Sequence, residues 1–116
     1  MIKQQTLYKV VSAAEWQQAQ DEGVFRGSGI DHTDGFIHLS APNQVVETVQ
    51  KHFAGQRELV LVAVDADSLA ETLRWEPSRD DALFPHVYGE IPMSAVVAVF
   101  QLPLGEDGSH QFPAVL

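Results

Sequence analysis

The chain has 116 residues, of which 45% are hydrophobic and 20% are charged; this predicts one folded domain, residues 1–116, and excludes a largely disordered chain. Its net charge of -9, from 7 basic and 16 acidic residues, argues against general nucleic-acid binding and against binding to an anionic membrane, since both need clustered Lys and Arg. The chain contains no cysteine, which excludes disulfides, thiolate nucleophiles and thiolate metal ligands.

The N-terminal stretch, MIKQQTLYKV, lacks the apolar run of a signal peptide. The longest apolar stretch, residues 59–64, is far shorter than the roughly 20 residues that cross a membrane. We therefore expect a cytoplasmic protein without a membrane partner. Nothing in the sequence indicates an oligomeric state.

The first predicted elements are a strand and a helix. Residues 7–11 are rich in apolar and β-branched side chains, which predicts a strand. Ser12 and Glu15 have the S-x-x-E spacing of a capping box, so a helix should begin at Ser12. Gly23 is a natural end for this helix.

A second strand and a second helix follow two turns. Residues 27–29 and the Asp34-Gly35 pair are turn signals, and residues 36–40 predict a short strand directly after them. A helix is expected after Pro42 and up to Gly55. Its predicted apolar face consists of Val45, Val46, Val49 and Phe53.

Residues 58–64 predict a strand that is apolar at every position from Leu59, so both of its faces should be covered. Asp67 is expected to cap a short helical turn at residues 68–73.

The last third of the chain gives weaker patterns. Residues 74–88 contain two prolines and are expected to form mostly a loop, of a length that is often functional. Residues 95–102 predict a final strand, and residues 105–116 an irregular tail. Strands and helices are mixed without strict alternation, so the predicted fold class is α+β, with a small mixed or antiparallel split sheet and flanking helices.

The segment DGFIHLS, residues 34–40, is the first candidate for a ligand site. Alternate side chains of a strand face opposite sides, so Ile37 and Leu39 should face the core while His38 and Ser40 share the other face. An imidazole beside a hydroxyl suits the wall of a polar site.

The segment FPHVYGEIP, residues 84–92, is the second candidate. If it is extended, His86 and Tyr88 share a face, and Gly89 permits a close backbone approach. A strand histidine taken alone is more often a hydrogen-bonded structural residue, and a tyrosine a half-buried aromatic. Two such pairs in one small chain favour a single small-molecule site that contains His38 and His86.

Residues just before this segment extend the candidate site. Trp75 can stack on a flat ring, and Arg74 or Arg79 can hold a phosphate. The alternative is that Trp75 anchors the core or a loop, while Arg74 forms a surface ion pair with Glu76.

Metal and phosphate-loop patterns are weak. Residues 27–29 lack the spacing and the lysine of a Walker loop. His38 and His86 with Asp34 or Glu90 would form a known type of ligand set, but no spacing demands a metal, so no metal ligand is assigned. The remaining histidines are expected at the surface or to carry little signal: His32, His52 and His110.

The strings DGFIHLS and LRWEPSRDDALFPHVYG resemble the bacterial domain-of-unknown-function family 952, and the resemblance covers residues 7–113. It implies a fold similar to the ADP-ribosylation fold, a split sheet with helices around an NAD-binding cleft. Residues 35–40, opened by Gly35, resemble the second ligand-contacting element of that fold, and His86 or Glu90 falls near the third.

The resemblance implies a ligand like NAD or a related nucleotide, with NAD as substrate and no resident cofactor assigned. His38 would hydrogen-bond a ribose or phosphate, and His86 would act as a donor or as an acid–base group in ribosyl transfer or hydrolysis. The alternatives are a non-catalytic module that binds a metabolite or partner protein, and a metal-dependent hydrolase. The further ligand-binding candidates are Gly35, Ser40, Arg74, Trp75, Arg79 and Tyr88.

Overall fold

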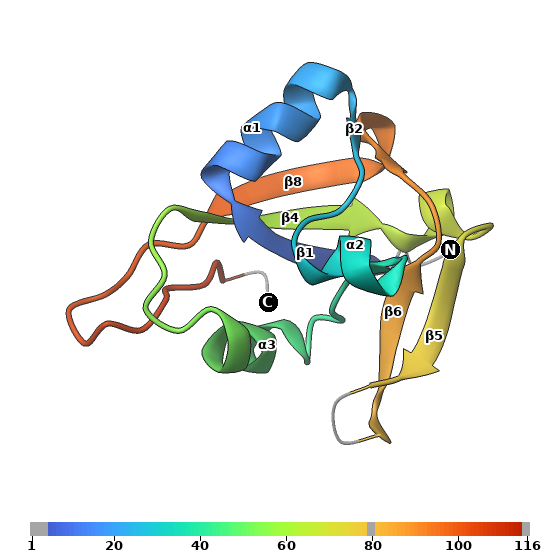
Figure 1. Cartoon of the computed structure of the whole chain (residues 1–116). Coiled ribbons are helices and arrows are strands. Elements are labelled where there is room, and N and C mark those ends of the chain that lie inside the picture. The colour runs from blue at the N-terminus through green and yellow to red at the C-terminus, as the bar shows by residue number, and fades with distance from the viewer. Residues whose placement is uncertain (1–4, 79–80, 115–116) are drawn as a thin grey trace.

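The computed structural model describes residues 5–78 and 81–114, which form antiparallel sheets with α-helices around them (Figure 1). In chain order the elements, with η for short 3-10 helices, are β1 (Thr6–Ser12), α1 (Ala13–Glu22), β2 (Val24–Phe25), α2 (Ile30–Asp34), β3 (Ile37–His38), α3 (Val45–His52), β4 (Leu59–Asp65), η1 (Ala66–Leu69), β5 (Leu73–Pro77), β6 (Leu83–Val87), β7 (Ile91–Pro92), η3 (Met93–Ala95) and β8 (Val96–Gln101). The predicted α+β class with antiparallel pairing is confirmed.

The central sheet has the strand order β1-β4-β8 and is covered on both faces. Val60, Val62 and Val64 of β4 pack in one core cluster with Trp16 and Ala19 of α1. The intervening positions of β4 pack in a second cluster with two valines of α3: Leu59, Leu61, Ala63, Val45 and Val49. Figure 1 shows α1 and α3 on opposite sides of this sheet. The prediction that both faces of this strand are buried is confirmed.

The first helix begins and ends as predicted. Ser12 is its N-cap, and its Oγ accepts a hydrogen bond from the backbone N–H of Glu15 at 3.1 Å. Gly23 is the C-cap with φ 84°, in the left-handed region that glycine adopts without steric cost.

The prediction of a loop at residues 74–88 is wrong. Leu73–Pro77 and Leu83–Val87 are antiparallel strands, and they form the sheet β3-β6-β5. A proline in a strand removes one backbone N–H donor and keeps its carbonyl as an acceptor. Pro85 still takes part in pairing, because its carbonyl accepts the backbone N–H of Leu39 at 2.9 Å.

Three further details differ from the predictions. The N-cap of the short helix is Asp65 and not Asp67. This helix ends at Leu69, and Leu73, predicted to be its last residue, is the first residue of β5. Residues 30–34, for which no helix was predicted between the two turn signals, form α2. Val46 was expected on the apolar face of α3 but is exposed. Only Val45 and Val49 of that face are fully buried.

The segment after β3 connects two sheets. Ile37 and His38 pair with Val87 and His86 of β6. Two residues later Ser40 pairs with Tyr8 of β1 through two backbone hydrogen bonds of 2.8 Å. This crossing brings His38 beside the central sheet.

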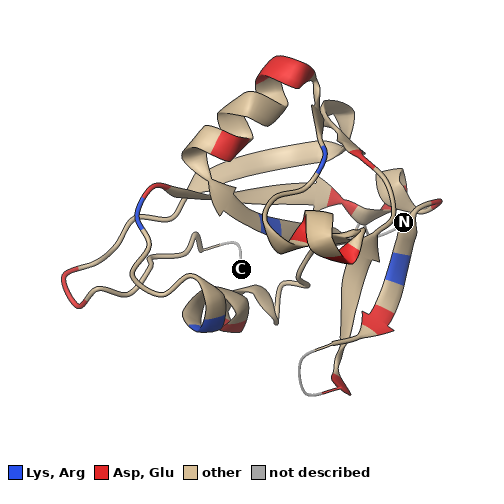
Figure 2. Ribbon diagram, viewed as in Figure 1, with Lys and Arg blue, Asp and Glu red and all other residues tan. Residues whose placement is uncertain are grey.

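Charged residues are unevenly spread in the described part of the chain. Figure 2 shows acidic positions on α1, α2 and β5, and a single basic position on β1 close to the acidic positions of α2. No helix in the described ranges is long and apolar enough to cross a membrane.

Candidate functional site

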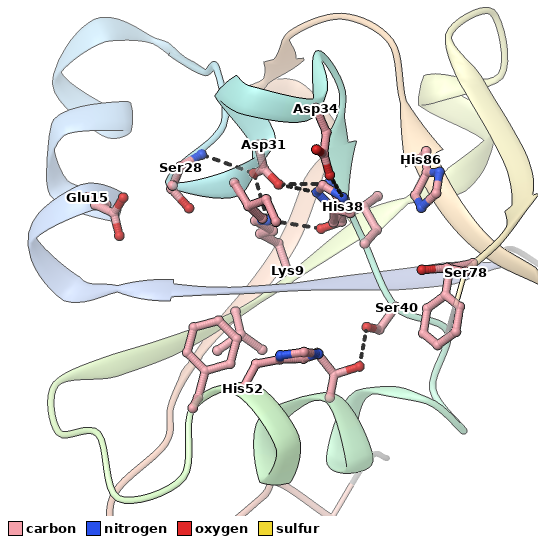
Figure 3. A pocket seen from close by; sticks show the side chains of 17 residues that line it. Lys9, Glu15, Ser28, Asp31, Asp34, His38, Ser40, His52, Ser78 and His86 are labelled. Carbon is pink, nitrogen blue, oxygen red and sulfur yellow. Dashed lines mark hydrogen bonds and ion pairs between the residues drawn. The ribbon is translucent and has the colours of Figure 1, made fainter. Parts of the chain in front are cut away.

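A cavity of about 530 Å³ lies over β1, between α2 and α3 (Figure 3). Residues from several elements line it, among them Lys9, Asp31, Asp34, His38, Ser40 and His86. In Figure 3 the imidazole of His86 points into this space beside His38. Of the site residues predicted from the sequence, His38, Ser40 and His86 line this cavity.

His38 and His86 are direct partners across β3 and β6. Their ring centroids lie 5.2 Å apart in an edge-to-face arrangement. The ring of Phe36 contacts both, with centroid distances of 4.6 Å to His38 and 4.2 Å to His86. The two predicted segments are therefore extended at the histidines and adjacent in space.

Carboxylates contact both ring nitrogens of His38. Nδ1 lies 2.6 Å from Oδ1 of Asp31, and Nε2 lies 3.0 Å from Oδ2 of Asp34. The contact of Nδ1 is a hydrogen bond, and that of Nε2 is a close polar contact with a second carboxylate. Each ring nitrogen of His38 therefore already faces a carboxylate of the protein.

Asp31 is a buried anion whose side chain is 1% exposed. It accepts hydrogen bonds from the backbone N–H of Ser28 at 3.0 Å and of His38 at 3.1 Å, and it forms a 2.7 Å ion pair with Lys9. Burial acts to raise the pKa of Asp31, but the bond to His38 and the charge of Lys9 outweigh it and lower the pKa to about 2.

Lys9 lies inside β1 with a side chain that is 10% exposed. Its Nζ also donates to the carbonyl of His38 at 3.0 Å. Burial lowers the pKa of Lys9, while the neighbouring Asp31 opposes that shift. The charge of Lys9 is thus committed to holding α2 and β3 on the central sheet.

His86 has one engaged and one unpaired nitrogen. Nδ1 donates to Oε1 of Glu76 at 2.8 Å, and the hydroxyl of Tyr88 donates to the same oxygen at 2.7 Å. Nε2 is buried and has no hydrogen-bond partner among the residues that the structure describes. The hydrogen bond from His86, followed by the one from Tyr88, lowers the pKa of Glu76. The bond to Glu76 in turn raises the pKa of Tyr88.

Ser40 lines the cavity but is tied to α3. Its Oγ lies 3.1 Å from Oγ1 of Thr48, which itself donates to the carbonyl of Gln44 at 3.1 Å. Ser40 is therefore the donor of this pair, and its hydroxyl is held in place at the cavity wall.

Arg74 and Trp75 do not belong to the cavity lining. Trp75 is the partner of Pro85, so it lies on the opposite face of the sheet from His86. Arg74 is the partner of His86, but its guanidinium donates to the carbonyls of Leu73 at 3.0 Å and Glu71 at 3.3 Å. The prediction for Arg79 lies outside the described residues.

Gly35 has a backbone role. It is the C-cap of α2 with φ 84°, and a Cβ atom there would meet no atom within 4 Å. It borders a second hollow of about 280 Å³, together with Arg26 and Glu90. Glu90 accepts from Arg26 at 2.7 Å. Among the described residues, no group of three His, Asp or Glu is placed to hold a metal ion.

Sequence reasoning did not single out Lys9, Asp31 or Glu76 as site residues. Lys9 carried a usable signal, since it is the one charged side chain in the apolar run LYKVV and a buried lysine needs an anionic partner. Asp31 and Glu76 carried no comparable signal. Asp31 contacts His38 from α2 and Glu76 contacts His86 from β5, so no spacing in the sequence links either pair.

Comparison with known proteins gives a family and a fold. The model of a family described as "Protein of unknown function (DUF952)" matches residues 10–99. The crystal structure of protein CC0527 from Caulobacter crescentus is 49% identical, with a TM-score of 0.87 over 91% of this chain and 93% of that chain. Its solution NMR structure is 48% identical, with a TM-score of 0.84 over 96% of both chains. No curated protein is detectably similar to this chain.

Proposed function

This chain belongs to the DUF952 family, and from its site we propose that it binds a small polar ligand of the nucleotide class, NAD or a relative, in the cavity that His38 and His86 line. We further propose that His86 acts on the ribose of that ligand as a general base. The ADP-ribosylation-like fold expected from the sequence is part of the same proposal.

The observation that carries the proposal is the unpaired Nε2 of His86. A buried polar atom without a partner costs about 1–3 kcal/mol, so such atoms are rare in folded chains and need an explanation. A ligand in the cavity provides one. Because Nε2 has almost no exposed surface, binding must also shift a side chain that now covers it.

The proposed reaction on NAD needs one base and good positioning. The oxygen of water attacks C1′ of the ribose, and its proton passes to Nε2 of His86. The bond between C1′ and the nicotinamide nitrogen breaks, and its electron pair stays with nicotinamide, which leaves neutral and needs no acid. The products are ADP-ribose and nicotinamide, and His86 later releases the proton to solvent.

The charges around the cavity support a reaction of this kind. Positive charge spreads onto the sugar as the glycosidic bond breaks. Glu15 lines the cavity, and a carboxylate stabilises such a charge where it develops. Asp31 and Asp34 are already paired with Lys9 and His38.

The second candidate is a non-catalytic module that binds a metabolite or a partner protein in the same cavity. The two carboxylates around His38 favour it, because each nitrogen of this ring already faces a carboxylate of the protein.

Thermal unfolding with NAD, ADP-ribose and nucleotides tests the proposal. A ligand at about 100 times its Kd adds about 2.7 kcal/mol of stability. We expect a shift with NAD or ADP-ribose that His86→Ala abolishes. Trp75→Ala, on the opposite face of the sheet, is the matched control and should keep the shift.

The outcomes separate the candidates. Nicotinamide release that requires His86 identifies an enzyme, whereas binding without release identifies the module. No shift with any of these compounds contradicts the nucleotide class.

A further inference from the structure

Two hydrogen bonds converge on one oxygen of Glu76. His86 donates to it from Nδ1 at 2.8 Å, and Tyr88 donates to it from its hydroxyl at 2.7 Å. An ionised carboxylate attracts both donors to one oxygen more strongly than a neutral carboxyl group does. The arrangement therefore suits an ionised Glu76. The lowered pKa of Glu76 and the raised pKa of Tyr88 agree with this arrangement.

This arrangement determines which nitrogen of His86 carries the proton. Nδ1 must bear a hydrogen in order to donate to Glu76. In a neutral imidazole the other nitrogen, Nε2, is then a bare acceptor. Because Nε2 has no partner among the described residues, its lone pair is left for a ligand.

The rest of the lining argues against an anionic group at this position. Arginine is absent from the described residues of the cavity, and three carboxylates, Glu15, Asp31 and Asp34, are present. The one lysine, Lys9, is paired with Asp31 at 2.7 Å. A phosphate at Nε2 would meet a lone pair, and the charge of Lys9, already held by Asp31, is not free to offset that repulsion.

We propose that Glu76 is a positioning residue that holds His86 with Nε2 unprotonated, so that the group meeting Nε2 is a hydrogen-bond donor, a sugar hydroxyl on binding and the attacking water in the reaction, and not a phosphate. The choice of a sugar rests on the proposed function, whereas the tautomer does not. Tyr88 supports Glu76 from the solvent side, since it is 46% exposed.

Nitrogen NMR of the imidazole rings tests the tautomer directly. In the ¹⁵N-labelled protein we expect His86 to show a protonated Nδ1 and a bare Nε2 once the ring is neutral. Glu76→Ala should mix the two tautomers. Tyr88→Phe is the matched control, because it removes the other bond to the same oxygen and should leave the tautomer unchanged.

Glu76 lies on an edge strand and its side chain is 38% exposed, so the variant should keep the fold, which the NMR spectrum itself reports. A wild-type protein with its hydrogen on Nε2 overturns the proposal. A Glu76→Ala protein that keeps the wild-type tautomer also overturns it.

Titration with adenosine and, separately, with inorganic phosphate tests the ligand group. We expect adenosine to move the Nε2 resonance and phosphate to leave it in place; phosphate alone moving it overturns the proposal. Failure of NAD to stabilise the protein, with the tautomer as stated, counts against the proposed function and leaves the role of Glu76 standing.

Discussion

His38 and His86 face each other across the β3–β6 pair, with ring centroids 5.2 Å apart, yet their hydrogen bonding is opposite. His38 has a carboxylate at each nitrogen, and His86 has one at Nδ1 and, among the residues that the structure describes, none at Nε2. One ring is thus satisfied within the protein, and the other offers a free acceptor. Substitutions at the two positions should therefore have different effects.

His38→Ala should destabilise the fold. Its imidazole is one of the groups that hold the buried carboxylate of Asp31, and loss of that bond should lower the free energy of unfolding by about 1–3 kcal/mol. Urea unfolding measures it. His52→Ala is the control, since this side chain is exposed on α3 and its removal should change stability by less than about 0.5 kcal/mol. Equal losses in the two variants would contradict the prediction.

Asp31 should make the fold sensitive to acid. Its pKa falls from the ordinary 3.8 to about 2 in the folded chain, which corresponds to about 2 kcal/mol of stability. A lowered folded pKa means that this stability is complete above the unfolded value and disappears as the pH falls from about 4 towards 2.

Unfolding measured along this pH range should show a smaller acid dependence for Asp31→Asn than for the wild type. Asp21→Asn, at an exposed position of α1, should follow the wild type. The same slope in all three proteins would show that Asp31 is not the titrating group.

Lys9→Met should lower the free energy of unfolding by more than the loss of a surface ion pair does. Removal of the cation breaks one of the two pairs of the buried Asp31 and leaves it the contact with His38, and breaking such a buried ion pair typically costs about 3–5 kcal/mol. Lys51→Met is the matched control, because the pair of Lys51 with Glu47 is half exposed and worth less than about 1 kcal/mol. Thermal unfolding of the two variants should separate them clearly, and similar melting temperatures would refute a structural role for Lys9.

Gly27→Ala should disturb the site through Asp31. A Cβ atom at Gly27 would lie 3.0 Å from Cβ of Asp31, and φ is 106°. Gly55→Ala is the control, with φ 75° and no atom within 4 Å, so it should cost only the backbone strain of about 1–2 kcal/mol. We expect Gly27→Ala to be the less stable variant and to shift the ring NMR signals of His38. Unchanged His38 signals would mean that Asp31 does not move.

Local patterns predicted much of the fold correctly. The spacing of Ser12 and Glu15 marked the start of α1, and Gly23 marked its end, because caps satisfy backbone groups within a few residues. The unbroken apolar run at residues 59–64 marked β4 as buried on both faces. The β5–β6 hairpin was missed, because its prolines disfavour a strand locally and only the pairing between strands compensates.

By itself, the sequence placed His38 on the polar face of a predicted strand, since side chains alternate along a strand whatever its surroundings. It placed His86 on such a face only on the condition that residues 84–92 are extended. Only the tertiary structure decided what each ring contacts. Asp31 comes to His38 from α2, and Glu76 comes to His86 from β5. Hydrogen bonds form within about 3 Å, and which groups come that close depends on how separate elements cross, a distance that no local pattern encodes.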